Sequence, residues 1–338
     1  MKARKPLGLM SVVLAAGLVL TACGGGDDAT ADGDTYDWDF TITTGNTSTW
    51  HEGAELFAEQ VEEESGGRMT VNIFPNEQLS NGNTVAGLEQ LMNGEKDLSF
   101  NSTIIYASID PKFGAVNAPF LYTDLEQARA TLEATGLEAY KEASAEHGVQ
   151  LLAMGESGFR QITNSVKPIR TPEDLQALKV RIPGIGLFDD IYKALGANPT
   201  TMSFSEVFTS LQQGTIDGQE NPIDIIYTSG LDEVQDHLTV WNYVYDPLIL
   251  GMNKDVYDSL SDEDKKIVDD AAQAAAELQI TNNRDKEDGE LEELRDKMEV
   301  VELTEEESTA FRDAMTPVYE QYQDIWGEDL ATAVTPEG

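Results

Sequence analysis

The sequence predicts an α/β fold in which a mostly parallel sheet is covered by helices. Stretches of alternating apolar residues, the pattern of strands, take turns with helical stretches that end near glycines. This rhythm is typical of parallel sheets, since each parallel pair needs a crossover connection between its strands. The last third of the chain is more helical.

The first residues predict a signal for export. Three cations within the first five residues precede an uncharged apolar stretch, residues 7–20, which is short for a membrane span and suits a signal-peptide core. Small residues then precede Cys23, the only cysteine, as in the bacterial lipobox, whose cysteine is lipidated after cleavage. We therefore expect a lipoprotein signal peptide at residues 1–22 and a lipidated Cys23 that anchors the secreted protein to the outer face of the cell membrane.

Residues 23–35 are rich in Gly, Asp and Ala and predict a flexible tether, because their acidic residues lack the spacing of a calcium loop. No disulfide is possible within a monomer that has one cysteine, so stability must come from the apolar core.

The charge of the chain restricts its partners. The formal net charge is −40, and removing the three cations of the signal peptide takes it to −43. Such a field repels nucleic acid and anionic lipid headgroups, and it also repels anionic ligands at long range. A site for an anion must therefore depend on a few cations placed within it.

Elements of both kinds are expected along the chain after the tether. Alternating apolar residues predict strands at 38–42, 69–73, 98–100, 151–154, 179–182 and 248–252. Helical patterns predict helices at 50–64 and 84–92.

The C-terminal third adds further elements. Ser261 is placed to cap a long helix, and Thr304 with Glu307 has the spacing of a capping box for another. Residues 298–303 between them predict a strand. We find no internal repeat and no second transmembrane segment.

Arg181 is the first candidate for binding an anion. If Val180 and Ile182 face one layer of core, Arg181 points to the other face of the strand, which Pro183 then ends. Ligands bind at the carboxyl ends of strands in open α/β sheets, and a guanidinium grips a carboxylate with two parallel hydrogen bonds. The local pattern fits a structural ion pair equally well.

A helix and a short strand follow Arg181. Ser203 and Glu206 have capping-box spacing, and the apolar stripe after them, which includes Phe204, predicts a helix that ends at Gly214. Asn221 ends the next strand before a proline, where its amide either donates to a ligand oxygen or stabilises the turn.

Several pieces of the chain occur in an order and at a spacing that match one family. They lie at residues 158–161, 172–175, 178–183, 196–199 and 204–222, with weaker likeness at 51–58 and 245–247 and over nearly all of the mature chain. Together they resemble the solute-binding proteins of tripartite ATP-independent periplasmic (TRAP) transporters, the DctP-like family.

The resemblance implies a two-lobed, periplasmic-binding-protein-like fold with a ligand cleft between the lobes, crossing strands and a long connecting helix. We expect lobe I to comprise residues 36–157 plus 247–286 and lobe II residues 158–246 plus 287–338. The lobes would close by a hinge on a small organic carboxylate, which a monomeric protein would deliver to the small and large membrane subunits of a TRAP-type secondary transporter. No cofactor and no metal is expected.

The resemblance also implies roles for individual residues. Arg181 matches the arginine that forms the main salt bridge to the ligand carboxylate. Arg160 matches a second arginine at the same group, Asn221 an amide donor beside it, and Phe204 an aromatic residue that packs on the ligand.

Five residues after strand ends are candidates for the opposite wall of the cleft, although no motif identifies them. They are Thr49, Trp50, His51, Asn101 and Ser102. His51 either faces the ligand or caps its helix. At Ser102 the sequence departs from the sialic-acid-binding branch, which carries an acidic residue there, so simpler organic acids are favoured.

Two other classes of function were weighed. An enzyme is disfavoured, because none of the three histidines has metal-ligand spacing and no nucleophile elbow or complete dinucleotide fingerprint is present. A binding lipoprotein of an ATP-driven importer or a ligand sensor remains the alternative, since two-lobed receptors of those systems share the principle of closure.

Overall fold

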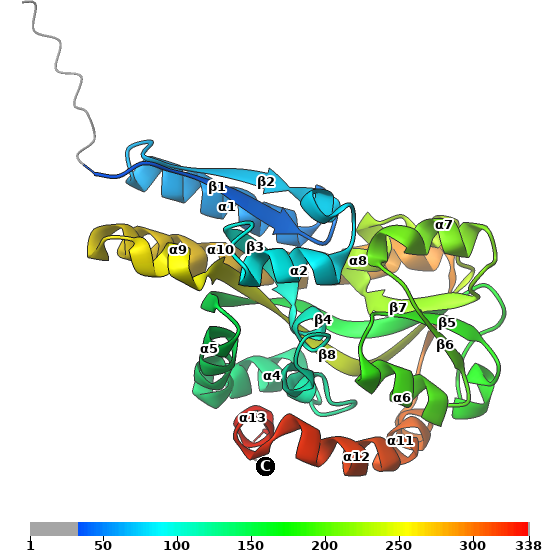
Figure 1. Cartoon of the computed structure of the whole chain (residues 1–338). Coiled ribbons are helices and arrows are strands. Elements are labelled where there is room, and N and C mark those ends of the chain that lie inside the picture. Colours follow the sequence, from blue (N-terminus) through cyan, green and yellow to red (C-terminus); the bar gives the residue numbers. More distant parts are fainter. Residues whose placement is uncertain (1–32, 337–338) are drawn as a thin grey trace, which may run out of the picture. The chain divides into compact units, whose positions relative to one another are not determined.

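A nine-stranded mixed sheet runs through residues 33–336, the part of the chain that the computed structural model describes (Figure 1). Neighbouring strands follow the order β2-β1-β3-β8-β4-β7-β5-β6, and β9 pairs with β8. Residues from Gly33 onward form one compact unit. The predicted signal peptide, Cys23 and most of the predicted tether lie outside the described residues.

Three parallel strands form one end of the sheet. The strand β1 (Tyr36–Ile42) lies between β2 (Met69–Phe74) and β3 (Leu98–Ser102). The helices α1 (Thr49–Glu64) and α2 (Thr84–Met92) connect these strands. All five elements were predicted, and the structure confirms them with small shifts of their ends.

The helix α1 forms where local chemistry favours it. Its first turn is capped by Ser48, whose hydroxyl accepts a hydrogen bond from the backbone N–H of His51. Ala54, Phe57 and Val61 recur at helical spacing and are fully buried. The chain leaves the helix at Gly66, whose φ of +65° lies in the left-handed region that glycine adopts without strain.

The other end of the sheet is also built from parallel strands. The strand β5 (Lys179–Ile182) lies between β6 (Asn198–Thr201) and β7 (Gly218–Pro222). The predicted capping box of Ser203 and Glu206 is confirmed. Instead of one helix, however, it opens a 3₁₀ turn, Phe204–Glu206, before α7 (Val207–Gln212).

Two long strands, β4 (Val149–Asn164) and β8 (His237–Asn253), cross the middle of the sheet. They pair antiparallel from Val149 opposite Asn253 to Asn164 opposite His237, with three register shifts between. The sequence predicted only short apolar parts of them, because buried polar side chains and bulges interrupt the alternation. The predicted lobe boundaries fall inside β4, β8 and the long helix α10, and they stay a prediction.

Most strand pairings are parallel, as predicted, and the crossing strands are the exception. The pairings β3–β8, β8–β4 and β4–β7 are all antiparallel. The physical reason is that β4 and β8 are not joined to their neighbours by single βα crossovers, so nothing requires them to run in the direction of the outer strands.

The helix α10 (Asp262–Lys297) is 36 residues long, and Ser261 caps it as predicted. It contacts α1, β4 and α8 (Ile223–Thr228), so it extends from the helix that follows β1 to the helix that follows β7. The side chain of Gln279 fastens it to the bulge in β4, because its amide donates to the carbonyl of Glu156 at 2.8 Å and accepts from the N–H of Glu156 at 2.9 Å.

The remaining elements surround this framework, and α11 to α13 follow one another beneath it in Figure 1. Helices and strands not yet named are α3 (Thr103–Tyr106), α4 (Leu125–Thr131), α5 (Leu137–Glu146), α6 (Gly186–Ala194), α9 (Lys254–Ser259), β9 (Glu299–Glu302), α11 (Glu305–Ala314), α12 (Thr316–Trp326) and α13 (Glu328–Val334). Short 3₁₀ turns occur at Pro75–Ser80, Pro111–Asn117, Pro172–Leu175 and Leu231–Glu233, and a π-helical turn at Leu132–Gly136. The strand predicted at 298–303 and the capping box at Thr304 are confirmed.

The apolar core has two large parts. One gathers around β1, β3, α1 and the first half of α10, and the other lies beneath β4, β5 and β8 against α5, α6, α11 and α12. Between residues 33 and 336, no helix combines the length and the apolar character that a membrane span requires.

Candidate ligand-binding site

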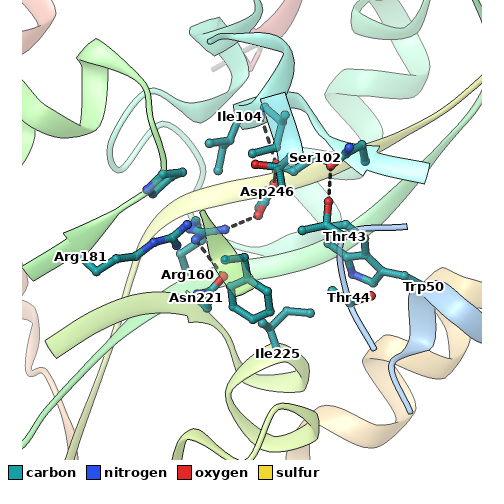
Figure 2. Close-up of a pocket in the computed structure, with 15 residues that line it drawn as sticks. Thr43, Thr44, Trp50, Ser102, Ile104, Arg160, Arg181, Asn221, Ile225 and Asp246 are labelled. Carbon is teal, nitrogen blue, oxygen red and sulfur yellow. Dashed lines mark hydrogen bonds and ion pairs between the residues drawn. The ribbon is translucent and has the colours of Figure 1, made fainter. Parts of the chain in front are cut away.

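A cavity lies where the two ends of the sheet meet the crossing strands (Figure 2). Its walls combine two arginines and one aspartate with amide, hydroxyl and apolar side chains. The lining residues are Thr43, Thr44, Trp50, Thr84, Asn101, Ser102, Ile104, Ile105, Arg160, Arg181, Pro183, Phe204, Asn221, Ile225 and Asp246. Seven of the nine predicted ligand-binding residues are therefore brought together around one space.

Arg181 reaches the cavity from β5 and is only 3% exposed. Its Nε and Nη2 donate to the carbonyl of Met202 at 3.1 and 2.9 Å, and its guanidinium lies 5.9 Å from the ring centre of Phe204. Within the described residues it forms no ion pair with a carboxylate. Burial lowers the pKa of Arg181 to about 10. The charge of Glu220 opposes this change, and the charge of Arg160 adds to it.

Arg160, on β4, is in the opposite situation. Its guanidinium pairs with the carboxylate of Glu220 through Nε and Nη2, and Nη1 donates to Asp246 at 2.5 Å. Nη2 also donates to the side-chain oxygen of Asn221 at 2.9 Å. Burial alone would lower the pKa of Arg160, but the two carboxylates outweigh burial and raise it.

Asn221 is the second-last residue of β7 and lies opposite Gln161 of β4. Its Oδ1 accepts from Arg160, and its Nδ2 donates to Gln219 at 2.5 Å. These two bonds determine which way the amide faces. Since an amide nitrogen carries two protons, one donor of Asn221 remains available in the cavity.

Asp246 is the charged lining residue that sequence reasoning missed. It lies on β8. Its Oδ2 accepts a hydrogen bond from Arg160, and its Oδ1 accepts one from the hydroxyl of Ser102. Burial raises the pKa of Asp246, and the charge of Arg160 and the hydrogen bond from Ser102 oppose that rise. The available signal was a lone carboxylate inside an otherwise apolar run of β8.

Polar neutral groups form the wall opposite the arginines. The hydroxyl of Thr43 donates to Oδ1 of Asn101 at 2.8 Å. Behind the wall, Nδ2 of Asn101 donates to Glu77 at 3.2 Å, and Glu77 pairs with Lys96 at 3.3 Å. The indole N–H of Trp50 is buried and has no hydrogen-bond partner among the described residues.

Two predicted residues are not brought to this cavity. The hydroxyl of Thr49 instead lies within 3.4 Å of Asp224 and Asn283, and Nε2 of His51 lies 3.3 Å from Glu55 one helical turn later. Successive helical residues point about 100° apart, so Trp50 alone of the three faces the cavity. A ligand-binding role for each predicted residue stays a prediction.

The described residues contain no group of three or more His, Cys, Asp or Glu side chains that is arranged to hold a metal ion. The cavity combines an unpaired buried cation, an amide donor and neutral hydrogen-bonding groups. These features fit reversible binding of a small anion.

Comparisons with known proteins agree with this interpretation. The profile of the DctP family, described as bacterial extracellular solute-binding protein, family 7, matches residues 40–324. A solute-binding protein of Verminephrobacter eiseniae is 35% identical over 289 residues, which cover 85% of each chain.

Two crystal structures of TRAP periplasmic solute-binding proteins are closely similar. The protein from Polaromonas sp. JS666, bound to D-erythronate, is 34% identical with a TM-score of 0.84, and the match covers 90% of this chain and 100% of that one. The protein from Ralstonia eutropha H16, with bound (S)-2-acetolactate, is 31% identical with a TM-score of 0.86, and the match covers 88% of this chain and 97% of that one.

Proposed function

The chain belongs to the DctP family, the solute-binding proteins of TRAP transporters, and we propose that it captures its small organic carboxylate with Arg181 as the anchor. The expected family and the two-lobed α/β fold are confirmed. The role of this family is to bind a solute outside the cytoplasm and deliver it to a TRAP transporter. Its members are solute-binding transport proteins.

The observation that carries the proposal is the difference between the two arginines in the cavity. Arg160 already has two carboxylate partners, whereas Arg181 is buried and has only a carbonyl. A buried cation without a counter-ion is costly, so a ligand carboxylate on Arg181 would remove that cost. The free amide proton of Asn221 supports the same placement. Relatives that hold D-erythronate and acetolactate, both carboxylates, favour this class of ligand.

A thermal-shift screen of the purified protein against organic acids tests the proposal. A ligand at 100 times its Kd is expected to add about 2.7 kcal/mol of stability, which shifts the melting temperature by several degrees. The shift should vanish in Arg181→Ala. If mass spectrometry shows an empty cavity and no organic acid shifts the melting temperature, the proposal is wrong.

The lipid anchor is a separate proposal, because Cys23 lies outside the described residues. A sole cysteine directly after a signal-peptide core supports lipidation and anchoring on the outer face of the membrane. Cys23→Ser should release the protein from the membrane fraction of the producing cells. Retention of Cys23→Ser in that fraction, after a salt wash, would contradict it.

We also propose that the protein is monomeric and closes over its ligand before it docks on the small and large membrane subunits. Two contacts between segments that we assign to lobe I and lobe II support closure. The hydroxyl of Ser205 donates to the carbonyl of Gly82 at 3.1 Å, and that of Thr47 to Thr228 at 3.3 Å. Small-angle scattering should show compaction of a monomer on ligand binding. An unchanged radius of gyration with saturating ligand would argue against closure.

A further inference from the structure

We propose that the ligand is a monocarboxylate whose carbon chain carries hydroxyl groups, and that the cavity discriminates against dicarboxylates. This inference rests on the proposed function, because it assigns a more specific ligand class to the same site. It follows from the number and placement of charges and hydrogen-bonding groups on the walls.

Only one place in the cavity can neutralise a carboxylate. Two cations line it, Arg160 and Arg181, together with one anion, Asp246. The guanidinium of Arg160 donates from all three of its nitrogens to Glu220, Asp246 and Asn221. A ligand anion at Arg160 would compete with two buried carboxylates. Arg181, which pairs with none in residues 33–336, is therefore the single anion subsite.

The wall opposite Arg181 offers no cation to a second carboxylate. Its side chains are neutral, and Asp246 adds a negative charge beside them. The nearest buried cation behind this wall is Lys96, which is 2% exposed, does not line the cavity and is paired with Glu77. A second carboxylate would lose its hydration without gaining a counter-ion, and this strongly disfavours binding.

The same wall has hydrogen-bond acceptors without a donor, which a ligand could supply. Thr43 has committed its only proton to Asn101, so its oxygen faces the cavity as an acceptor. Asp246 accepts one bond on each oxygen, although a carboxylate has room for about four. An ionised carboxylate cannot donate to these groups, but a hydroxyl can.

A hydroxyl could also accept a hydrogen bond from an unpartnered donor on this wall. The buried indole N–H of Trp50 finds no acceptor among the described residues, and a hydroxyl oxygen would accept from it while its proton goes to Thr43 or Asp246. Apolar side chains, with Ile104 and Ile225 among them, also line the cavity, which suits a short carbon chain.

A series of four-carbon acids tests the inference by calorimetry. Butanoate, 2-hydroxybutanoate, 2,3-dihydroxybutanoate, succinate and malate share their length and differ in hydroxyl and carboxylate groups. The best hydroxy monocarboxylate is expected to bind at least about tenfold more tightly than butanoate and than either dicarboxylate, the typical effect of one satisfied hydrogen bond or one unpaired charge.

The possible results distinguish a wrong ligand class from a wrong function. Succinate or malate binding as tightly as the best hydroxy acid would overturn this inference and leave the proposed function standing. A broad panel of organic acids without any binding would overturn the proposed function, and this inference with it.

Comparing two ligands in the wild type and in a Thr43 variant measures the contribution of the hydroxyl acceptor at Thr43. Thr43→Val should reduce the advantage of hydroxy acid over butanoate, taken as the ratio of the two affinities, by roughly three- to tenfold. Thr309→Val, at an exposed threonine of α11, is the matched control and should change neither affinity. An undiminished advantage in Thr43→Val would contradict the proposed contact.

Asp246→Asn tests the rejection of a second charge. It keeps the size of the side chain but removes the negative charge, so the ratio of hydroxy-monocarboxylate to dicarboxylate affinity should fall by about tenfold. A ratio is used because a partly destabilised variant weakens both ligands alike. A ratio equal to that of the wild type would count against the charge argument.

Discussion

Arg160 and Arg181 are alike in type and burial, yet they do different work. Arg160 completes a buried network with Glu220 and Asp246, and so holds together β4, β7 and β8. Arg181 has only backbone and aromatic contacts, which leaves its charge for a ligand. The sequence-based expectation gave Arg181 the main salt bridge to the ligand carboxylate and Arg160 a second contact with the same group. Among the described residues, only Arg160 already has carboxylate partners.

This difference predicts opposite effects of truncation on stability. Arg160→Ala leaves two buried carboxylates without their cation and should cost about 3–5 kcal/mol of unfolding free energy. Arg170→Ala is the matched control, since Arg170 pairs with Glu307 at the surface and should cost no more than about 1 kcal/mol. Urea unfolding of both variants without ligand measures the difference. Equal losses would contradict the structural role of Arg160.

Strand alternation was enough to place Arg181 correctly, because it is a local property of four residues. The partners of Arg160 were not predictable in this way, since Glu220 and Asp246 lie 60 and 86 residues away in the chain. Thr49 and His51 were expected near the ligand because they follow the end of a predicted strand. Successive residues of a helix point in different directions, so these two side chains point away from the cavity. Which residue of α1 faces the cavity depends on which side of the helix packs on the sheet.

Among the elements, the turn Pro75–Ser80 is tied by a buried ion pair to the segment just before β3. Glu77 and Lys96 are 1% and 2% exposed and lie behind Asn101, which accepts the hydroxyl of Thr43 in the cavity wall. Burial lowers the pKa of Lys96, and the charge of Glu77 opposes that change. Each member of the pair therefore stabilises the fold only while the other is present.

Removing one partner of this pair is expected to be worse than removing both. Lys96→Met leaves Glu77 charged and buried and should cost about 3–5 kcal/mol of unfolding free energy. The double variant Lys96→Met/Glu77→Gln should recover much of this loss, because Gln still accepts from Asn101. Denaturant unfolding of the single and double variants measures the effect. Additive losses would contradict it.

Most helices and outer strands were predictable, since capping residues, glycine ends and apolar periodicity are local signals. The long strands β4 and β8 were only partly so, because bulges and the buried charges of Glu156 and Arg160 break the alternation of β4. The antiparallel centre of the sheet was missed for a different reason. The direction of a strand depends on tertiary pairing, which a strand–helix rhythm does not report.

At the scale of the whole molecule, several carboxyl groups lie between α8 and α10. Burial raises the pKa of Asp224 to about 6, against an opposing hydrogen bond from Thr49. Burial and neighbouring carboxylates also raise the pKa values of Glu287 and Glu290 to about 7. These groups resist ionisation in the folded state more than in the unfolded chain.

The sign of the resulting pH dependence follows from linkage. Because the folded-state pKa values are raised, the folded protein holds these protons longer than the unfolded chain does. The stabilisation is complete below the ordinary carboxyl pKa values and is lost as pH rises through about 6 to 7.

Melting temperatures measured between pH 5 and pH 8 should therefore fall as the pH rises, and Asp224→Asn with Glu290→Gln should flatten the dependence. Glu146→Gln, at an exposed carboxylate whose pKa is lowered by Lys112, is the control and should leave the slope in this range unchanged. An identical slope in the double variant and the wild type would show that these groups do not titrate as expected.

The acidity of the chain makes the central claim demanding, because a net charge of −40 opposes the approach of any anion. The most direct test is a calorimetric titration of the best organic acid into the wild type and Arg181→Ala. The account predicts saturable binding to the wild type and a loss of roughly 30- to several-thousand-fold in Arg181→Ala, with little change in the stability of the ligand-free protein. Wild-type affinity retained in Arg181→Ala would contradict the account, since the anchor would then lie elsewhere.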